Sequence, residues 1–153
     1  MKNSLKALLA VTAILSFSAL AAPPWQSNYQ QGMQEFAING AQGTSLTFSC
    51  DQGGNNPGTK NIFLTLSNGQ TFDTVNTNSE FDVKVDGKEF YLYDPASRVG
   101  LANWTLFWEM LGKTKSTTFT ITMAGKSFTF PVSNAKAVFK SQDAEQCIRN
   151  PSF

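Results

Sequence analysis

The chain has 153 residues, with 12 basic and 11 acidic side chains and no histidine. This balance lacks the basic excess of a nucleic-acid-binding protein, so we expect no nucleic-acid partner. The absence of histidine removes the usual general base of hydrolases and the commonest metal ligand, so we expect no enzyme, catalytic residue, metal or cofactor.

Residues 1–21 have the pattern of a signal peptide. Lys2 and Lys6 precede the apolar run 7–20, and Ala19-Leu20-Ala21 has the small-x-small form of a cleavage site. The run is short for a membrane span, although an uncleaved N-terminal anchor is the alternative. Residues 22–153 then form a single exported domain with no later membrane span, which predicts a periplasmic or secreted protein.

Cys50 and Cys147 are the two cysteines of the chain. An even number of cysteines in an oxidising compartment predicts one disulfide between them. A redox-active thiol, the alternative, is normally part of a close Cys-x-x-Cys pair, and these two cysteines lie far apart. We therefore expect a structural disulfide.

Alternating apolar and polar residues predict strands over most of the mature chain. In the first half we expect strands at 35–39, 44–50, 61–66 and 70–75. Residues 23–33 are polar around Trp25 and Tyr29, and form either a flexible leader or an edge segment whose aromatic side chains dock on the domain. The loop 51–60 is rich in turn-forming residues and is either a binding loop or a plain connection.

Three hairpins are predicted from turn dipeptides. Asp86-Gly87 joins the two halves of 81–93, with Val83 opposite Phe90. Asn68-Gly69 predicts a second type I′ turn, whose register places Phe72 on the same face as Phe63 and Thr65. The third hairpin joins 117–123 to 126–132 across Ala124-Gly125.

One helix is predicted at 104–111, with Asn103 as its N-cap and Gly112 after its end. Its apolar stripe is either the buried side of a helix at one end of a sandwich or an exposed docking face; the stripe consists of Trp104, Phe107, Trp108 and Leu111. A shorter helix is expected at 135–140. The fold class is therefore all-β, mainly antiparallel: a β-sandwich or small barrel of about eight strands with one or two short helices.

Two tracts resemble the invasion-associated locus B family. One is the strand 81–87, which ends in Val-Asp-Gly, and the other runs from Leu111-Gly112-Lys113 through the 118–123 strand to 130–139. That family comprises exported bacterial β-sandwich proteins without known catalysis, linked by name to host-cell invasion. The resemblance implies an exported β-sandwich and carries over no functional residues.

These features lead to one main hypothesis: an exported, non-enzymatic binding protein of the bacterial envelope that recognises another protein, in the envelope or outside the cell. An inhibitor or immunity protein against a cell-wall-degrading toxin is its most concrete form. The predicted partner-binding residues are Tyr91, Tyr93, Arg98, Asn55, Asn56 and Lys60.

A carbohydrate or small-molecule binding module, with Trp104 and Trp108 as its platform, is the alternative, as is a secreted virulence-associated protein. The carbohydrate hypothesis requires these two tryptophans to be accessible to solvent.

Overall fold

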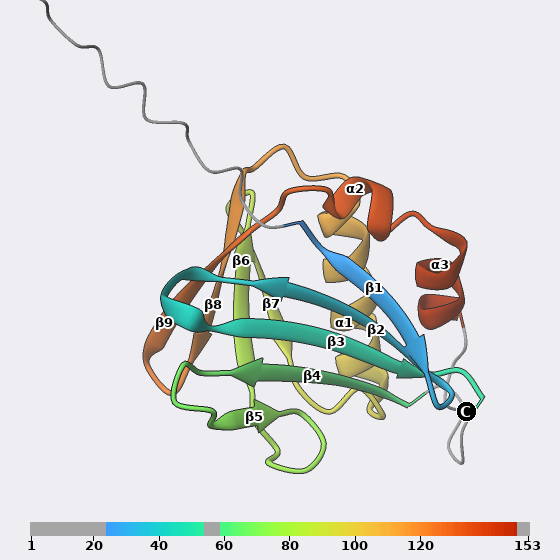
Figure 1. Cartoon of the computed structure of the whole chain (residues 1–153), viewed down its shortest axis with the longest axis horizontal. Helices are drawn as coiled ribbons and strands as arrows, with labels where there is room; N and C mark the ends of the chain where they lie inside the picture. The colour runs from blue at the N-terminus through green and yellow to red at the C-terminus, as the bar shows by residue number, and fades with distance from the viewer. Residues whose placement is uncertain (1–23, 54–58, 150–153) are drawn as a thin grey trace, which may run out of the picture.

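The fold is mainly antiparallel β, as a computed structural model of residues 24–53 and 59–149 shows (Figure 1). Within these residues nine strands form two sheets, one of five strands in the order β1-β2-β3-β4-β5 and one of four in the order β7-β6-β8-β9. This confirms the predicted fold class, with one strand more than expected. The predicted signal peptide lies outside the described residues.

The five-stranded sheet consists of β1 (Gln26–Gln30), β2 (Met33–Asn39), β3 (Ser45–Asp51), β4 (Lys60–Thr65) and β5 (Thr71–Asp73). The four-stranded sheet consists of β6 (Phe81–Val85), β7 (Lys88–Leu92), β8 (Thr118–Met123) and β9 (Lys126–Pro131). The helices are the 3-10 turn η1 (Ala41–Gly43), α1 (Arg98–Leu111), α2 (Ala135–Val138) and α3 (Gln142–Arg149).

The two sheets form the layers of a sandwich. In Figure 1 the five-stranded sheet lies in front, and the strands of the other sheet cross behind it, with α1 beside β7 in the rear layer. Large side chains from both layers meet between them: Phe36, Phe48, Phe119, Trp104 and Trp108 are each at most 1% exposed. The apolar stripe of α1 is therefore part of the core, as one of the two sequence interpretations expected.

Two of the predicted hairpins have the expected turns. Asp86 and Gly87 both have positive φ, as a type I′ turn requires, and Val83 pairs with Phe90. Ala124 and Gly125 form the same turn between β8 and β9. Alternation and turn chemistry agree at both places, and the predicted pairing of Val83 with Phe90 is confirmed.

The hairpin between β4 and β5 differs from the prediction by one residue. Gly69 has a φ of +83°, but Asn68 is not among the residues with positive φ, so the turn is not type I′. The Leu66 N–H donates to the Gln70 carbonyl, and the Gly69 N–H donates to the Leu66 carbonyl. This is a three-residue loop with glycine in the left-handed position. Phe72 therefore pairs with Leu64 and shares its face, so the predicted face for Phe72 was wrong.

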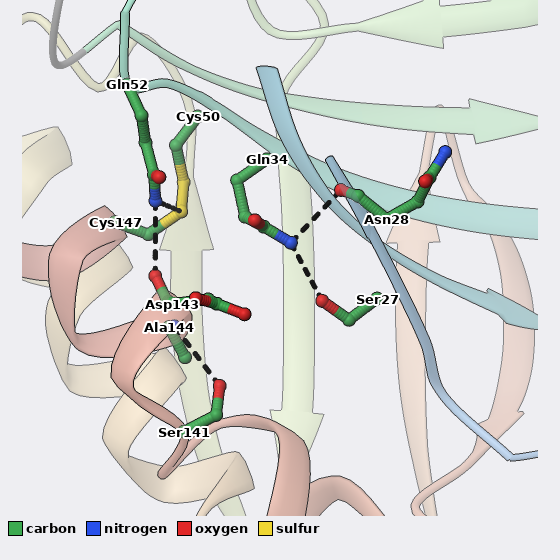
Figure 2. Close-up of a disulfide and its surroundings, with 9 residues drawn as sticks. All are labelled: Ser27, Asn28, Gln34, Cys50, Gln52, Ser141, Asp143, Ala144 and Cys147. Carbon is green, nitrogen blue, oxygen red and sulfur yellow. Dashed lines mark hydrogen bonds between the residues drawn. A yellow bond between two sulfur atoms is a disulfide. The ribbon is translucent and has the colours of Figure 1, made fainter. Parts of the chain in front are cut away.

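The N-terminal segment is an edge strand, as the second alternative expected, but of its two aromatic side chains only Trp25 docks on the domain and Tyr29 is 57% exposed. Trp25 is 3% exposed and stacks on Phe48 with ring centroids 5.6 Å apart. Farther along β1, the buried amide of Gln34 donates to Ser27 Oγ at 2.7 Å and to the Asn28 carbonyl at 3.0 Å (Figure 2). These contacts hold β1 against the sheet although its five side chains are exposed.

The main helix begins earlier than predicted. Its N-cap is Ser97, whose Oγ accepts a hydrogen bond from the Gly100 N–H at 3.0 Å, so Asn103 lies inside the helix. A β-carbon on Gly100 would lie only 2.1 Å from the Asp94 carbonyl oxygen. The absence of a side chain at Gly100 therefore allows the first turn of α1 to pack on the loop before it.

The two cysteines form the predicted disulfide. Cys50, in β3, is bonded to Cys147, in α3, with Cα atoms 5.6 Å apart (Figure 2). The Gln52 amide donates to the Asp143 carbonyl at 3.3 Å beside it. Both cysteines are 1% exposed, so the bridge joins the C-terminal helix to the sheet inside the fold. α3 itself was not predicted, which makes three α-helices among the described residues where one or two were expected.

Candidate functional site

A groove of about 710 Å³ opens at one end of the sandwich. Three parts of the fold enclose it: the β4–β5 hairpin with the loop that follows, the outer face of the four-stranded sheet, and the β8–β9 turn. Figure 1 shows the β4–β5 and β8–β9 turns close together at the lower left. The core is not closed at this end, because the short strand β5 leaves apolar side chains only partly covered.

The floor of the groove is apolar. Leu66, Phe72 and Phe128 pack on the core but are only half-buried, and Met123 lies beside them at the end of β8. Phe72 and Phe128 come from different sheets. The groove therefore exposes the edge of the hydrophobic core between the two layers, which is the kind of surface that an apolar group of a ligand covers.

One wall of the groove is a polar row on the outer face of the four-stranded sheet. Asp82 pairs with Tyr91 on one side and with Thr122 on the other, so the three side chains lie level with one another. Tyr91 is 41% exposed, opposite the buried Phe90 and Leu92. Tyr91, one of the predicted partner-binding residues, therefore points outward, and its side chain forms part of the groove wall.

Glu80 fixes the tyrosine of this wall. The Tyr91 hydroxyl donates a hydrogen bond to the Glu80 carboxylate, which lies just before β6. This bond, assisted by desolvation and by the negative charges of Glu80 and Asp82, raises the pKa of Tyr91 to about 12. The phenol is therefore neutral at physiological pH and is held in one orientation, with its ring available to a ligand.

The opposite rim is a loop held by Asp73. The Oδ1 atom of this buried carboxylate accepts the backbone N–H groups of Val75 and Asn76 at 3.0 and 2.6 Å and the Asn61 amide at 3.1 Å. Burial alone favours a higher pKa for Asp73, but these hydrogen bonds outweigh it and lower the pKa. The carboxylate thereby positions Asn78 and the rest of the rim.

The other predicted binding residues do not gather at this groove. Tyr93 is half-buried, with its ring 5.3 Å from that of Tyr91, and is not a lining residue. Arg98 is exposed at the start of α1, outside the groove. Asn55 and Asn56 lie outside the described residues.

The predicted position of Lys60 was wrong. It is the first residue of β4, pairs with Cys50 and is 1% exposed, because the β3–β4 ladder extends into the expected loop. Burial lowers the pKa of its ammonium group. Lys60 is therefore a buried residue of the sheet, not a contact on a surface loop.

Sequence reasoning missed most of the groove. Phe72 and Glu80 come from one part of the chain and Met123 and Phe128 from the β8–β9 hairpin, and no local signal relates these two parts. Strand alternation identified Tyr91 alone.

The charged residues among those lining the groove are Glu80, Asp82 and Lys126. In the part of the chain that the structure describes, no three acidic or cysteine side chains cluster as metal ligands would, and no helix is long and apolar enough to cross a membrane. The groove can offer apolar contact, an oriented aromatic ring and a rim of hydrogen-bonding groups.

The fold and groove define a disulfide-linked β-sandwich with an open groove at one end. A family model described as YfjT matches residues 23–139, and the chain belongs to the YfjT family. The match spans all nine strands and α1, so the groove lies within the family's common region. No curated protein and no solved structure matches the chain. The resemblance to the invasion-associated locus B family stays a prediction.

Proposed function

We propose that this protein is an exported, non-enzymatic binding protein of the bacterial envelope that recognises another protein through the groove beside Tyr91. The observation that carries the proposal is the groove itself: an apolar floor at an open end of the core, a polar rim, and an exposed tyrosine in a fixed orientation. Protein interfaces combine these elements, with an aromatic anchor in a desolvated centre and polar groups around it.

The chemistry of the chain supports a binding role over a catalytic one. The sequence contains no histidine, and its two cysteines are bonded to each other, so neither a Ser-His nor a Cys-His nucleophile is present. In the groove, Glu80 is engaged by the Tyr91 hydroxyl. A rigid scaffold with a preformed groove suits an inhibitor or immunity protein, and a cell-wall-degrading toxin remains the partner we propose.

The compartment follows from the same features. A disulfide that joins β3 to α3 requires an oxidising environment to form, and the sequence starts with the pattern of a signal peptide. We place the mature protein in the periplasm or outside the cell on these grounds.

Affinity capture with the mature, oxidised protein tests the proposal. The bait is offered to envelope extracts of its own organism and of competing bacteria, in three forms: wild type, Tyr91→Ser and Tyr29→Ser. Tyr29 is a matched control, because it is 57% exposed in β1 and does not line the groove. We expect a stoichiometric partner that Tyr29→Ser retains and that Tyr91→Ser binds roughly tenfold more weakly. Equal capture by all three baits would exclude the groove.

A glycan is the second candidate ligand, because the groove sets hydrogen-bonding side chains such as Asn78 and Asp82 beside an aromatic ring. The platform first considered for it, Trp104 and Trp108, is buried, so that version is wrong. Binding of soluble cell-wall fragments to the wild type and the Tyr29→Ser variant, but not to Tyr91→Ser, would favour this function when no protein is captured.

A further inference from the structure

The outward side of α1 carries apolar side chains that nothing in the described part of the chain covers. Val99 is 61% exposed and Leu106 is 56% exposed, with the exposed Ala102 between them. Their spacing of three and four residues places them in one row along the helix. The row is distinct from the proposed binding groove, since no residue of α1 lines that groove.

The composition of α1 is unusual for a helix with one face in contact with solvent. Its other side is already committed to the core through Trp104, Phe107, Trp108 and Leu111. Such helices normally carry charged and polar residues on the outer face. Among the 14 residues of α1, only Arg98 and Glu109 are charged. An apolar row at this position indicates a contact with another molecule.

The charged residues at the ends of the row indicate that this other molecule is a second copy of the chain. Arg98 lies at the start of α1 and Glu109 near its end, about 16 Å apart along the helix axis. Glu109 Oε2 also accepts a hydrogen bond from Lys113 Nζ at 3.1 Å, so a second cation would share this exposed carboxylate with Lys113. When two copies of α1 lie antiparallel across a two-fold axis, Arg98 of each comes level with Glu109 of the other. In the same register Leu106 of each copy meets the small Ala102 of the other. The face is thus complementary to itself, as a symmetric dimer interface must be.

We propose that α1 forms the interface of a homodimer, in which two helices pack antiparallel through Val99, Ala102 and Leu106 and pair Arg98 with Glu109 at both ends. The antiparallel arrangement also brings the opposite ends of two helix dipoles together. One 14-residue helix offers a small contact area, so the dimer is weak and reversible. Each dimer carries two of the grooves described above.

Sedimentation equilibrium of the mature, oxidised protein, from micromolar to near-millimolar concentration, tests this. We expect the average mass of the wild type to rise from one chain toward two. Leu106→Glu should stay monomeric over the same range. Val75→Glu is the matched control, because Val75 is a 43% exposed apolar residue outside α1, and it should dimerise like the wild type. Circular dichroism checks that both variants are folded.

Charge reversal tests the antiparallel register. Arg98→Glu and Glu109→Arg should each weaken the dimer by roughly tenfold, since each places like charges opposite one another. The double variant Arg98→Glu/Glu109→Arg should regain wild-type affinity. The helix dipole favours an acid at residue 98 and a base at residue 109. Glu109→Arg also removes the exposed ion pair with Lys113, which contributes little to stability, and circular dichroism checks that each variant is folded.

Three results would overturn the proposal. If the wild type stays monomeric at every concentration, α1 does not form a homodimer interface, and its apolar row would contact a different protein. If the wild type dimerises and Leu106→Glu does not weaken the dimer, the interface lies elsewhere. If the single charge reversals weaken the dimer and the double reversal does not restore it, the helices pack in a different register.

Discussion

Tyr91 in β7 donates its phenol hydrogen to the carboxylate of Glu80, which lies immediately before β6, and the two side chains form part of one wall of the groove. The hydrogen bond needs the neutral phenol and the charged carboxylate. It therefore favours the protonated form of Tyr91 and raises its pKa from 10.0 to about 12.

This shift predicts a late tyrosine titration. A raised pKa in the folded state stabilises the fold fully below the ordinary value of 10.0, and this stabilisation is lost as the pH rises through about 12. Ultraviolet absorbance should show one of the three tyrosines ionising near pH 12. Tyr91→Phe should remove that step, Glu80→Gln should move it toward pH 10, and Tyr29→Phe should leave it in place. A late step that survives in Tyr91→Phe would contradict the assignment.

The disulfide is predicted to supply a large part of the stability. Cys50 and Cys147 are 97 residues apart, and closing a loop of that length in the unfolded chain is worth ~4 to 5 kcal/mol in the chain-entropy model. Urea unfolding of the Cys50→Ser/Cys147→Ser variant should show a loss of about this size. The reduced wild-type protein is the control and should behave alike, whereas a loss below ~1 kcal/mol would mean that the unfolded chain is not constrained by the bond.

Asp73 is predicted to hold the rim of the groove. Asp73→Ala leaves the N–H groups of Val75 and Asn76 without their acceptor, which should cost ~2 kcal/mol in unfolding free energy. It should also weaken partner binding, because the rim loop contributes Asn78 to the groove. Asp73→Asn is the matched control: its amide oxygen can still accept, so it should cost less than Asp73→Ala.

The pH dependence of the unfolding free energy distinguishes the contribution of the Asp73 charge from that of its hydrogen-bond geometry. Its pKa is lowered in the folded protein, so its stabilisation is present above the ordinary value of 3.8 and is lost as the pH falls through the lower folded value. Wild-type unfolding free energy should therefore fall more steeply in acid than that of Asp73→Asn. Parallel curves for the two proteins would show that the carboxylate charge adds nothing.

The sequence predicted the elements whose signals are local. Asp86-Gly87 was correct because the turn dipeptide and the alternation of both strands agree on one register. Asn68-Gly69 misled because the same dipeptide also fits a three-residue loop with glycine in the left-handed position. Which loop forms depends on the pairing of Leu64 with Phe72, and no residue of the turn specifies that pairing.

Most residues of the groove could not be predicted from the sequence, for a related reason. Phe72 and Phe128 belong to different sheets and meet at the groove only because the sandwich is left open at one end. Tyr91 was found because strand alternation alone shows that it points away from the core. Lys60 was predicted to lie in a loop because the residues before it form turns. In the structure the β3–β4 ladder extends as far as Lys60, which pairs with Cys50.

The tryptophans provide the last prediction, since their burial distinguishes a core from a binding platform. Trp25, Trp104 and Trp108, all the tryptophans of the chain, are 3%, 1% and 0% exposed. Iodide is charged and does not enter an apolar core, so it should quench the fluorescence of the native protein several-fold less than that of the urea-unfolded protein. Acrylamide, a neutral quencher, is the control for the unfolded state. Native quenching as strong as that of the unfolded chain would mean that α1 exposes its aromatic face, and a tryptophan platform for carbohydrate would again be tenable.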